Sequence, residues 1–269
     1  MKIYCNGDIV EKESLGDIFE PGFLFGWGVF EPLRTYGDNI PFLSEHIARL
    51  NKGLSLLGIE EVEIEWEKEI RALLSQNNLK DGYVRLTAYK KRGGTGLIIY
   101  VDKFGYYPDQ IYEKGFSAII SPYKRYIGDI SCQVKSLSYL TNRVSWLKAQ
   151  VAKKNEALIL NTDGYLTGGS RGNLFIVKDN KVITPTIDCG AFSGITREAV
   201  IKILKDLDIE VKECKVLIED LSSADEAFIT SSLMEVMPLV EAEGKNIGDG
   251  KPGNITLKVL SEYRKITRE

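Results

Sequence analysis

Short apolar runs and helix-like repeats alternate along most of the chain. Residues 3–5 and 9–10 are apolar and flank Asn6-Gly7-Asp8, a pattern typical of a β-hairpin. Runs rich in β-branched and aromatic residues predict further strands at 29–36, 83–90, 97–101, 116–120, 157–161, 174–177, 182–184, 210–216 and 226–230. Helical spacing of apolar residues predicts helices at about 44–57, 64–76, 139–152 and 196–207, and one more after Gly253.

This alternation predicts an α+β protein in two parts. The stretch from Lys103 to Lys114 has no regular period and contains Pro108. We therefore expect an N-terminal domain of residues 1–113 and a C-terminal domain of residues 114–269.

Composition and charge exclude several classes of function. The chain has 269 residues, 43% of them hydrophobic, and a formal net charge of −3. Without a long run of Lys and Arg, this balance argues against a nucleic-acid or anionic-membrane partner. No apolar stretch has the length of a membrane span or forms a signal region, and four scattered cysteines suit a reducing cytoplasm. With one histidine, His46, a multi-histidine metal site is excluded, and we expect this residue on a helix surface or at a cap.

Lys135 precedes a predicted helix and is the first candidate for chemistry. An isolated lysine is usually a surface residue, but a lysine amine can also form a Schiff base with an aldehyde. Tyr139 lies about one helical turn further along, so we expect both side chains to face the same pocket.

The run Gly194-Ile195-Thr196-Arg197 opens a predicted helix. Free amides at a helix N-terminus can bind a phosphate, although a simple capped helix start explains the run equally well. Three further residues are candidate phosphate ligands, each with an ordinary alternative as a surface or turn residue: Arg49, Ser231 and Ser232.

Taken in order, these segments resemble the class IV aminotransferases, which are fold-type IV pyridoxal phosphate enzymes. The likeness covers almost the whole chain and rests on the segments Gly22–Glu31, Glu45–Leu50, Lys135–Leu140, Gly194–Arg197, Ala224–Pro238 and Ile247–Gly253.

The resemblance implies a fold, a cofactor and a set of roles. The fold would be a small N-terminal α/β domain on a larger C-terminal pseudo-barrel, assembled as a homodimer with sites near the subunit interface. The cofactor would be pyridoxal 5′-phosphate, joined to Lys135, with Tyr139 at its phenolic oxygen. The implied phosphate ligands are Arg49, Ile195, Thr196 and Ser232.

Gly168 departs from the family pattern. The family has Thr-Glu-Gly where this chain has Thr167-Gly168-Gly169, and that glutamate pairs with the pyridine nitrogen of the cofactor. Without an anion there, the pKa of the nitrogen falls and the carbanion is less stabilised. Another carboxylate or a water takes its place, the chemistry needs less electron withdrawal, or catalysis is impaired.

The resemblance also bears on the substrate. Tyr83-Val84-Arg85 is similar to a pocket strand of the branched-chain enzymes, and Phe25, Phe30 and Tyr139 would add an apolar wall. Backbone amides near Ser231–Leu233, helped by Arg85, would bind the substrate carboxylate.

We therefore expect an aminotransferase for apolar L-amino acids, with 2-oxoglutarate as acceptor. The alternatives are an aminodeoxychorismate lyase and a pyridoxal phosphate-binding homologue with little turnover.

Overall fold

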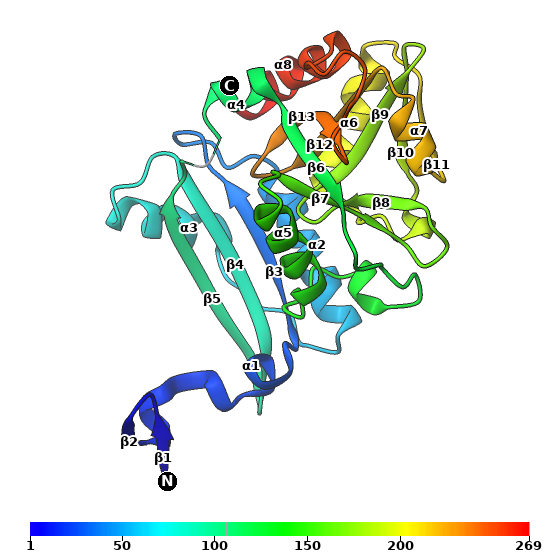
Figure 1. The fold of residues 1–269 in the computed structure, drawn as a ribbon. Coiled ribbons are helices and arrows are strands. Elements are labelled where there is room, and N and C mark those ends of the chain that lie inside the picture. Colours follow the sequence, from blue (N-terminus) through cyan, green and yellow to red (C-terminus); the bar gives the residue numbers. More distant parts are fainter. Residues whose placement is uncertain (106, 269) are drawn as a thin grey trace.

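The computed structural model describes residues 1–105 and 107–268, arranged around two main β-sheets, each with its own hydrophobic core (Figure 1). The chain starts with the predicted hairpin of β1 (Lys2–Cys5) and β2 (Asp8–Glu11), which projects away from the rest of the molecule. Asn6 and Gly7 both have positive φ, as a tight two-residue hairpin turn requires. The 3₁₀ segment η1 (Lys12–Phe19) and the short helix α1 (Pro21–Phe25) connect the hairpin to the first main sheet.

The first main sheet has three antiparallel strands in the order β3-β4-β5. They are β3 (Gly28–Arg34), β4 (Gly82–Lys91) and β5 (Gly94–Lys103). Helices α2 (Leu43–Leu56) and α3 (Trp66–Gln76) pack against this sheet. Their apolar faces bury Leu54 and Ile70 against Leu86 of β4, as the helical spacing predicts.

The second main sheet has nine strands, eight of them in the order β11-β10-β9-β12-β13-β6-β7-β8, with β14 paired to β13. In chain order they are β6 (Phe116–Ile120), β7 (Glu156–Leu160), β8 (Leu166–Gly169), β9 (Asn173–Lys178), β10 (Lys181–Pro185), β11 (Val211–Cys214), β12 (Glu226–Ser231), β13 (Glu235–Ala242) and β14 (Lys245–Asn246). β8, at one end of this order, also contacts β9 and β10 near the other end. The sheet therefore curls into a partly closed barrel, and the predicted α+β fold with a C-terminal pseudo-barrel is confirmed.

Several helices pack against the curled sheet. The helical segments are α4 (Asp109–Lys114), η2 (Ile130–Cys132), α5 (Leu140–Val151), η3 (Ile187–Cys189), α6 (Ile195–Asp206), α7 (Ile218–Ser222) and α8 (Asn254–Arg268). α8 packs on β12, β13 and α6, and α5 packs on β7. The core contains the stacked rings of Phe175 and Phe228, whose centroids are 4.9 Å apart. Within the part of the chain that the structure describes, no helix is both long and apolar enough to cross a bilayer.

Two of the contacts that join the two sheets lie along β3 and just beyond its end. The segment that carries Lys135 runs beside β3, since the Phe30 amide donates to the Lys135 carbonyl and the Leu137 amide donates to the Gly28 carbonyl. The second contact is the fully buried carboxylate of Glu235 on β13. It accepts hydrogen bonds from two residues that follow or end β3 and from two on α8: Arg34, Tyr36, Arg264 and Arg268.

The predicted strands and helices are present, with ends that shift by a few residues. α4 lies in a stretch expected to be irregular, and the segments α1 and β13 have no strong periodic pattern. One side-chain expectation was wrong, because the Phe25 side chain is 71% exposed instead of lining a pocket. The nearby Trp27 is 41% exposed, with its indole N–H bonded to the Leu57 carbonyl.

Candidate cofactor site

The amine of Lys135 lies in a cage of three aromatic rings. Its Nζ is 5.0 Å from the ring centre of Phe30, 5.4 Å from that of Tyr139 and 5.1 Å from that of Phe192. Burial, assisted by the positive charge of Arg49, lowers the pKa of Lys135 to about 8, despite the opposing effect of Glu31. A lysine with this pKa is neutral in about a tenth of the molecules at pH 7, a far larger share than for an ordinary lysine, and the neutral amine is the nucleophile.

Tyr139 lies next to Lys135, as predicted, but for a different reason. α5 begins only at Leu140, so no helix joins the two residues. Instead, the ring of Tyr139 packs edge-on against Phe30, with 5.2 Å between ring centres. Its hydroxyl donates to the Ser170 carbonyl at 3.1 Å and accepts from the Asn142 amide at 3.1 Å. The phenol is thus oriented by the chain: its one proton is directed at the Ser170 carbonyl, and its oxygen accepts from Asn142.

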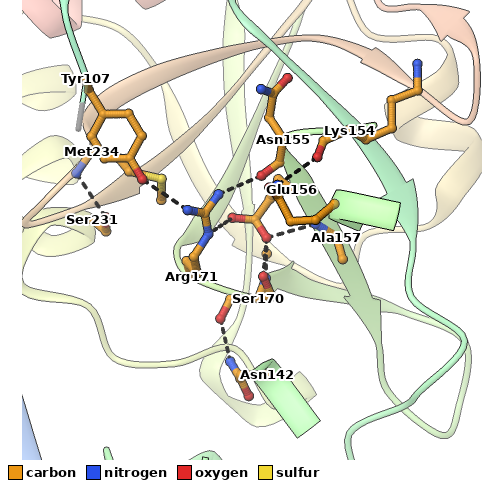
Figure 2. Close-up of polar contacts among 12 residues, drawn as sticks. Tyr107, Asn142, Lys154, Asn155, Glu156, Ala157, Ser170, Arg171, Ser231 and Met234 are labelled. Atoms are coloured by element: carbon orange, nitrogen blue, oxygen red, sulfur yellow. Dashed lines mark hydrogen bonds and ion pairs between the residues drawn. The ribbon is translucent and has the colours of Figure 1, made fainter. Parts of the chain in front are cut away.

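A buried carboxylate, Glu156, holds Ser170 in place (Figure 2). It accepts from the Ser170 amide at 3.1 Å and from the Ser170 hydroxyl. Arg171 donates to the same carboxylate at 3.3 Å and to the Tyr107 hydroxyl at 3.0 Å. Asn142 reaches this cluster through the Ser170 carbonyl at 2.7 Å. The cluster therefore fixes the carbonyl that orients Tyr139.

Gly168, the position that departs from the family pattern, lies in β8 and has a φ of +137°. A Cβ on this residue would be 3.0 Å from the Gly172 carbonyl oxygen, so a side chain here requires a shift of the backbone. The guanidinium of Arg125 flanks this glycine, because it donates to the Thr167 hydroxyl at 3.1 Å and to the Gly169 carbonyl at 3.3 Å. The neighbouring carboxylate of Glu156 is already bonded to Ser170 and Arg171, which argues against it as the replacement.

The predicted phosphate turn opens α6, with Gly194 as its N-cap. A Cβ at Gly194 would be 2.1 Å from the Asn173 side-chain oxygen, so a larger residue here requires that side chain to move. Thr196 is buried, with its hydroxyl 3.5 Å from that of Tyr263. Arg49 joins this turn by donating to the Ser193 carbonyl at 2.9 Å. The helix N-terminus and the arginine thus converge, although they are distant in sequence.

Glu31 is a site residue to which the sequence motifs gave no role. Its carboxylate is buried and accepts two bonds from Arg49, at 2.7 and 2.6 Å, and one from His46 Nδ1 at 2.8 Å. Burial raises the pKa of this carboxyl, but the bonds from Arg49 and His46 outweigh burial and lower it to about 2. Glu31 therefore stays ionised and locks the Arg49 guanidinium in a bidentate pair.

His46 was expected on a helix surface or at a cap, and this was wrong. It is 1% exposed, because the apolar face of α2 turns it towards β3. Its Nδ1 meets Glu31 and its Nε2 lies 3.2 Å from the Ser232 hydroxyl. Phe192 and Arg125 were also missed. The sequence held one signal for the burial of His46: it lies four residues before Leu50 and eight before Leu54, on the same apolar face of the helix.

The remaining predicted residues lie at the edge of this site. The Arg85 guanidinium stacks over Phe30 at 3.9 Å and its Nε donates to the Thr87 hydroxyl at 3.3 Å. Ser231 pairs with Glu235 across a tight turn that carries Ser232 and the half-buried Leu233. Within this turn the Met234 amide donates to the Ser231 hydroxyl at 3.2 Å, so that hydroxyl keeps its proton for another acceptor.

This set of residues fits pyridoxal phosphate. The lysine amine has a lowered pKa, a tyrosine hydroxyl lies beside it, and an arginine and a helix N-terminus meet at one point for a phosphate. Among the described residues, no cluster of three or more His, Cys, Asp and Glu side chains could hold a metal ion.

Comparisons with known proteins agree with this chemistry. A family model described as amino-transferase class IV matches residues 28–242. The chain is 35% identical to a putative branched-chain-amino-acid aminotransferase of Methanocaldococcus jannaschii, over 99% of this chain and 96% of that protein. It is 34% identical to a D-alanine aminotransferase of Bacillus licheniformis, over 96% of this chain and 94% of the relative. The crystal structure of Escherichia coli branched-chain amino acid aminotransferase superposes with a TM-score of 0.89 at 28% identity, covering 97% of this chain and 93% of that one. The chain therefore belongs to the class IV aminotransferases, which are enzymes that use pyridoxal phosphate.

Proposed function

We propose that this enzyme transfers an amino group between apolar L-amino acids and a 2-oxo acid such as 2-oxoglutarate. The observation that carries the proposal is the Lys135 amine, which has a lowered pKa and lies within an aromatic cage whose ring of Phe192 also contacts the Arg49 guanidinium. Phe30 and Tyr139 present apolar surface to a substrate side chain, and the branched-chain relatives support that substrate class.

Bound pyridoxal phosphate supplies an aldehyde for Lys135 and an electron sink for the substrate carbanion. The amine of Lys135, when it is not joined to the cofactor, would be the base that takes the proton of the substrate α-carbon. A pKa of about 8 suits this transfer, because a base is most effective when its pKa is near the working pH. Tyr139 holds the cofactor's phenolic oxygen, and Asn142 orients Tyr139.

The phosphate is bound by the amides of Ile195 and Thr196 at the start of α6, by Arg49, and by the hydroxyl of Ser232 with help from Ser231. The backbone amides of the same turn, Ser231–Leu233, bind the substrate carboxylate together with Arg85. The Glu31 carboxylate keeps the Arg49 guanidinium in place.

Gly168 leaves the cofactor nitrogen without a carboxylate from β8, and the Arg125 cation flanks this glycine. A cation favours the unprotonated form of a pyridine nitrogen, so this site withdraws electrons less strongly. We therefore infer a transaminase that is slower than one with a glutamate here.

The enzyme works as a cytoplasmic homodimer of two-domain subunits, residues 1–113 and 114–269. The large apolar side chains of Phe23, Phe25 and Trp27 support the dimer, since they are 68%, 71% and 41% exposed and cluster just before β3, which carries Phe30 and Glu31. Exposed apolar clusters of this kind mark protein interfaces.

The test is a spectral titration of the cofactor-loaded protein with single amino acids. L-Leucine is expected to convert bound pyridoxal phosphate into pyridoxamine phosphate and to release the matching 2-oxo acid. Conversion by D-alanine alone would favour the second candidate, a D-amino acid aminotransferase, which the 34% identical relative supports. Release of 4-aminobenzoate from aminodeoxychorismate would show the lyase, and a bound cofactor that no substrate converts would show a binding protein.

A further inference from the structure

The single histidine of the chain lies in a buried relay between the two sheets. Glu31 on β3 contacts His46 Nδ1 at 2.8 Å, and His46 Nε2 contacts the Ser232 hydroxyl at 3.2 Å. Ser232 belongs to the turn between β12 and β13, while His46 and Arg49 share one face of α2. The relay therefore ends at a hydroxyl that we have assigned to the phosphate.

The proton positions in this relay follow from the groups involved. The ionised carboxylate of Glu31 can only accept, so Nδ1 of His46 must carry a proton. If His46 is neutral, Nε2 has no proton and can only accept. The Ser232 hydroxyl must then donate its proton to His46.

Phosphate changes this requirement. The oxygens of a phosphate dianion are acceptors, and a serine hydroxyl has one proton. Ser232 therefore cannot donate to His46 and to a phosphate at the same time. If Nε2 becomes protonated, it donates to the Ser232 oxygen, and the serine proton is free to point at the phosphate.

We propose that His46 is a positioning residue that takes up a proton when a phosphate group binds, and so turns the Ser232 hydroxyl towards that group. The inference rests on the proposed phosphate site. It goes beyond it in assigning a role to His46 and a proton to the binding step.

The charges around His46 are consistent with such a change. Burial keeps the pKa of His46 below its ordinary value, against the pull of Glu31, and the cations Arg49 on the same helix and Lys135 on the segment beside β3 lower it further. A bound dianion offsets these two cations and adds a favourable charge next to Nε2. The cationic form of His46 is thereby stabilised in the loaded site.

The linkage has a definite sign. When a group has a higher pKa in the bound state than in the free state, binding takes up a proton between the two pKa values. The contribution of His46 to phosphate affinity should therefore fall as pH rises from its pKa in the free protein to its pKa in the loaded protein.

Because the chain has one histidine, every histidine ring signal in an NMR spectrum comes from His46. The full-length protein is labelled with ¹⁵N-histidine, and its ring nitrogens are followed by NMR from acid to alkaline pH, with and without pyridoxamine 5′-phosphate. This probe has the phosphate but no aldehyde, so it does not react with Lys135. We expect a neutral ring with the proton on Nδ1 in the free protein, and a titration midpoint raised by roughly one pH unit or more on binding.

The outcomes separate this inference from the proposed function. If the probe binds and the midpoint does not rise, the inference is wrong and the phosphate site remains. If the probe does not bind at all, the site and the inference are both wrong.

A second measurement distinguishes proton uptake by His46 from a purely structural role of this residue. Calorimetry in buffers of different protonation enthalpy counts the protons taken up on binding. At a pH between the two titration midpoints, the number should be lower in His46→Asn than in the wild type by about half a proton for a one-unit shift, and by more for a larger shift, because the variant lacks the titrating group. A variant that binds more weakly but takes up the same number of protons would contradict the proposal.

Discussion

The amine of Lys135 lies 5.0 Å from the ring centre of Phe30, and the backbone amide of Phe30 donates to the Lys135 carbonyl at 2.9 Å. Strand β3 therefore contacts both the backbone of Lys135 and its side-chain amine. This places the reactive group of the C-terminal half against the edge of the N-terminal sheet, where the substrate side chain is proposed to lie.

Replacing the lysine should abolish transfer and preserve the fold. Lys135→Met keeps an unbranched side chain but loses the base, so the rate of transamination should fall by at least about 10²–10⁴-fold. The thermal midpoint should stay the same or rise, because a neutral side chain does not carry the cost of burying an amine. Stopped-flow absorbance and a melting curve test both points, and a variant that retains even a tenth of the activity would refute the role of this residue.

The capture of pyridoxal phosphate by the cofactor-free protein should depend on the charge of Lys135. The neutral amine attacks the aldehyde, and its pKa of about 8 lies well below the ordinary value. The capture rate should therefore rise about tenfold per pH unit below pH 8 and level off above it. A rate that continues to rise until pH 10 would mean that the lysine titrates as an exposed residue.

Glu235→Gln should destabilise the protein strongly. The substitution removes a buried negative charge that accepts hydrogen bonds from three arginines between the two sheets. Loss of one partner of a buried ion pair typically lowers the free energy of unfolding by about 3–5 kcal/mol. The matched control is Glu210→Gln, whose partner Lys181 is as exposed as it is, and which should cost less than about 1 kcal/mol. Urea denaturation measures both, and equal losses would show that Glu235 is no more than a surface charge.

The wild type should also lose this contribution in acid. The Glu235 carboxyl is buried, which raises its pKa, but hydrogen bonds from Arg264 and Tyr36 and the nearby positive charges outweigh burial and lower it. Its stabilising effect is present above the pKa of the unfolded chain and is lost as pH falls through the folded value. The pH dependence of the unfolding free energy should therefore be flatter below about pH 4.5 in Glu235→Gln than in the wild type.

Two substitutions at Gly168 measure the effect of the glutamate charge that the family has at this position. Gly168→Glu and Gly168→Gln both add a Cβ at a φ of +137°, and each should lower stability by about 1–3 kcal/mol. Only Glu brings a carboxylate beside the cofactor, so the half-reaction with L-leucine should be faster in the Glu variant than in the Gln variant. Equal rates in the two would show that this position does not limit the chemistry.

Much of the fold follows from local pattern. The turn chemistry of Asn6-Gly7, the helical spacing of α2 and α6 and the apolar runs of β6 and β9 each predicted an element at nearly its observed place. The order of the motifs was sufficient for the resemblance to class IV aminotransferases, and that family is confirmed. Such patterns are readable because a helix or a hairpin depends on residues within a few positions of each other.

The environment of each motif residue was decided by tertiary structure. Tyr139 neighbours Lys135 through the ring of Phe30 and not through a helix, and Trp27 is exposed although its residue type favours burial. The partners Glu31, His46 and Ser232 come from three separate segments, and no period in the sequence relates them.

The sequence by itself thus determined the kinds of elements, their order and the presence of a lysine, an arginine and a helix start suited to one cofactor. Tertiary structure alone decided which charges meet: Arg49 with Glu31, Arg125 beside Gly168, and three arginines around Glu235. The physical reason is that pKa and hydrogen-bond direction depend on burial and on charges within a few ångströms, and folding brings those together from residues up to about 200 positions apart.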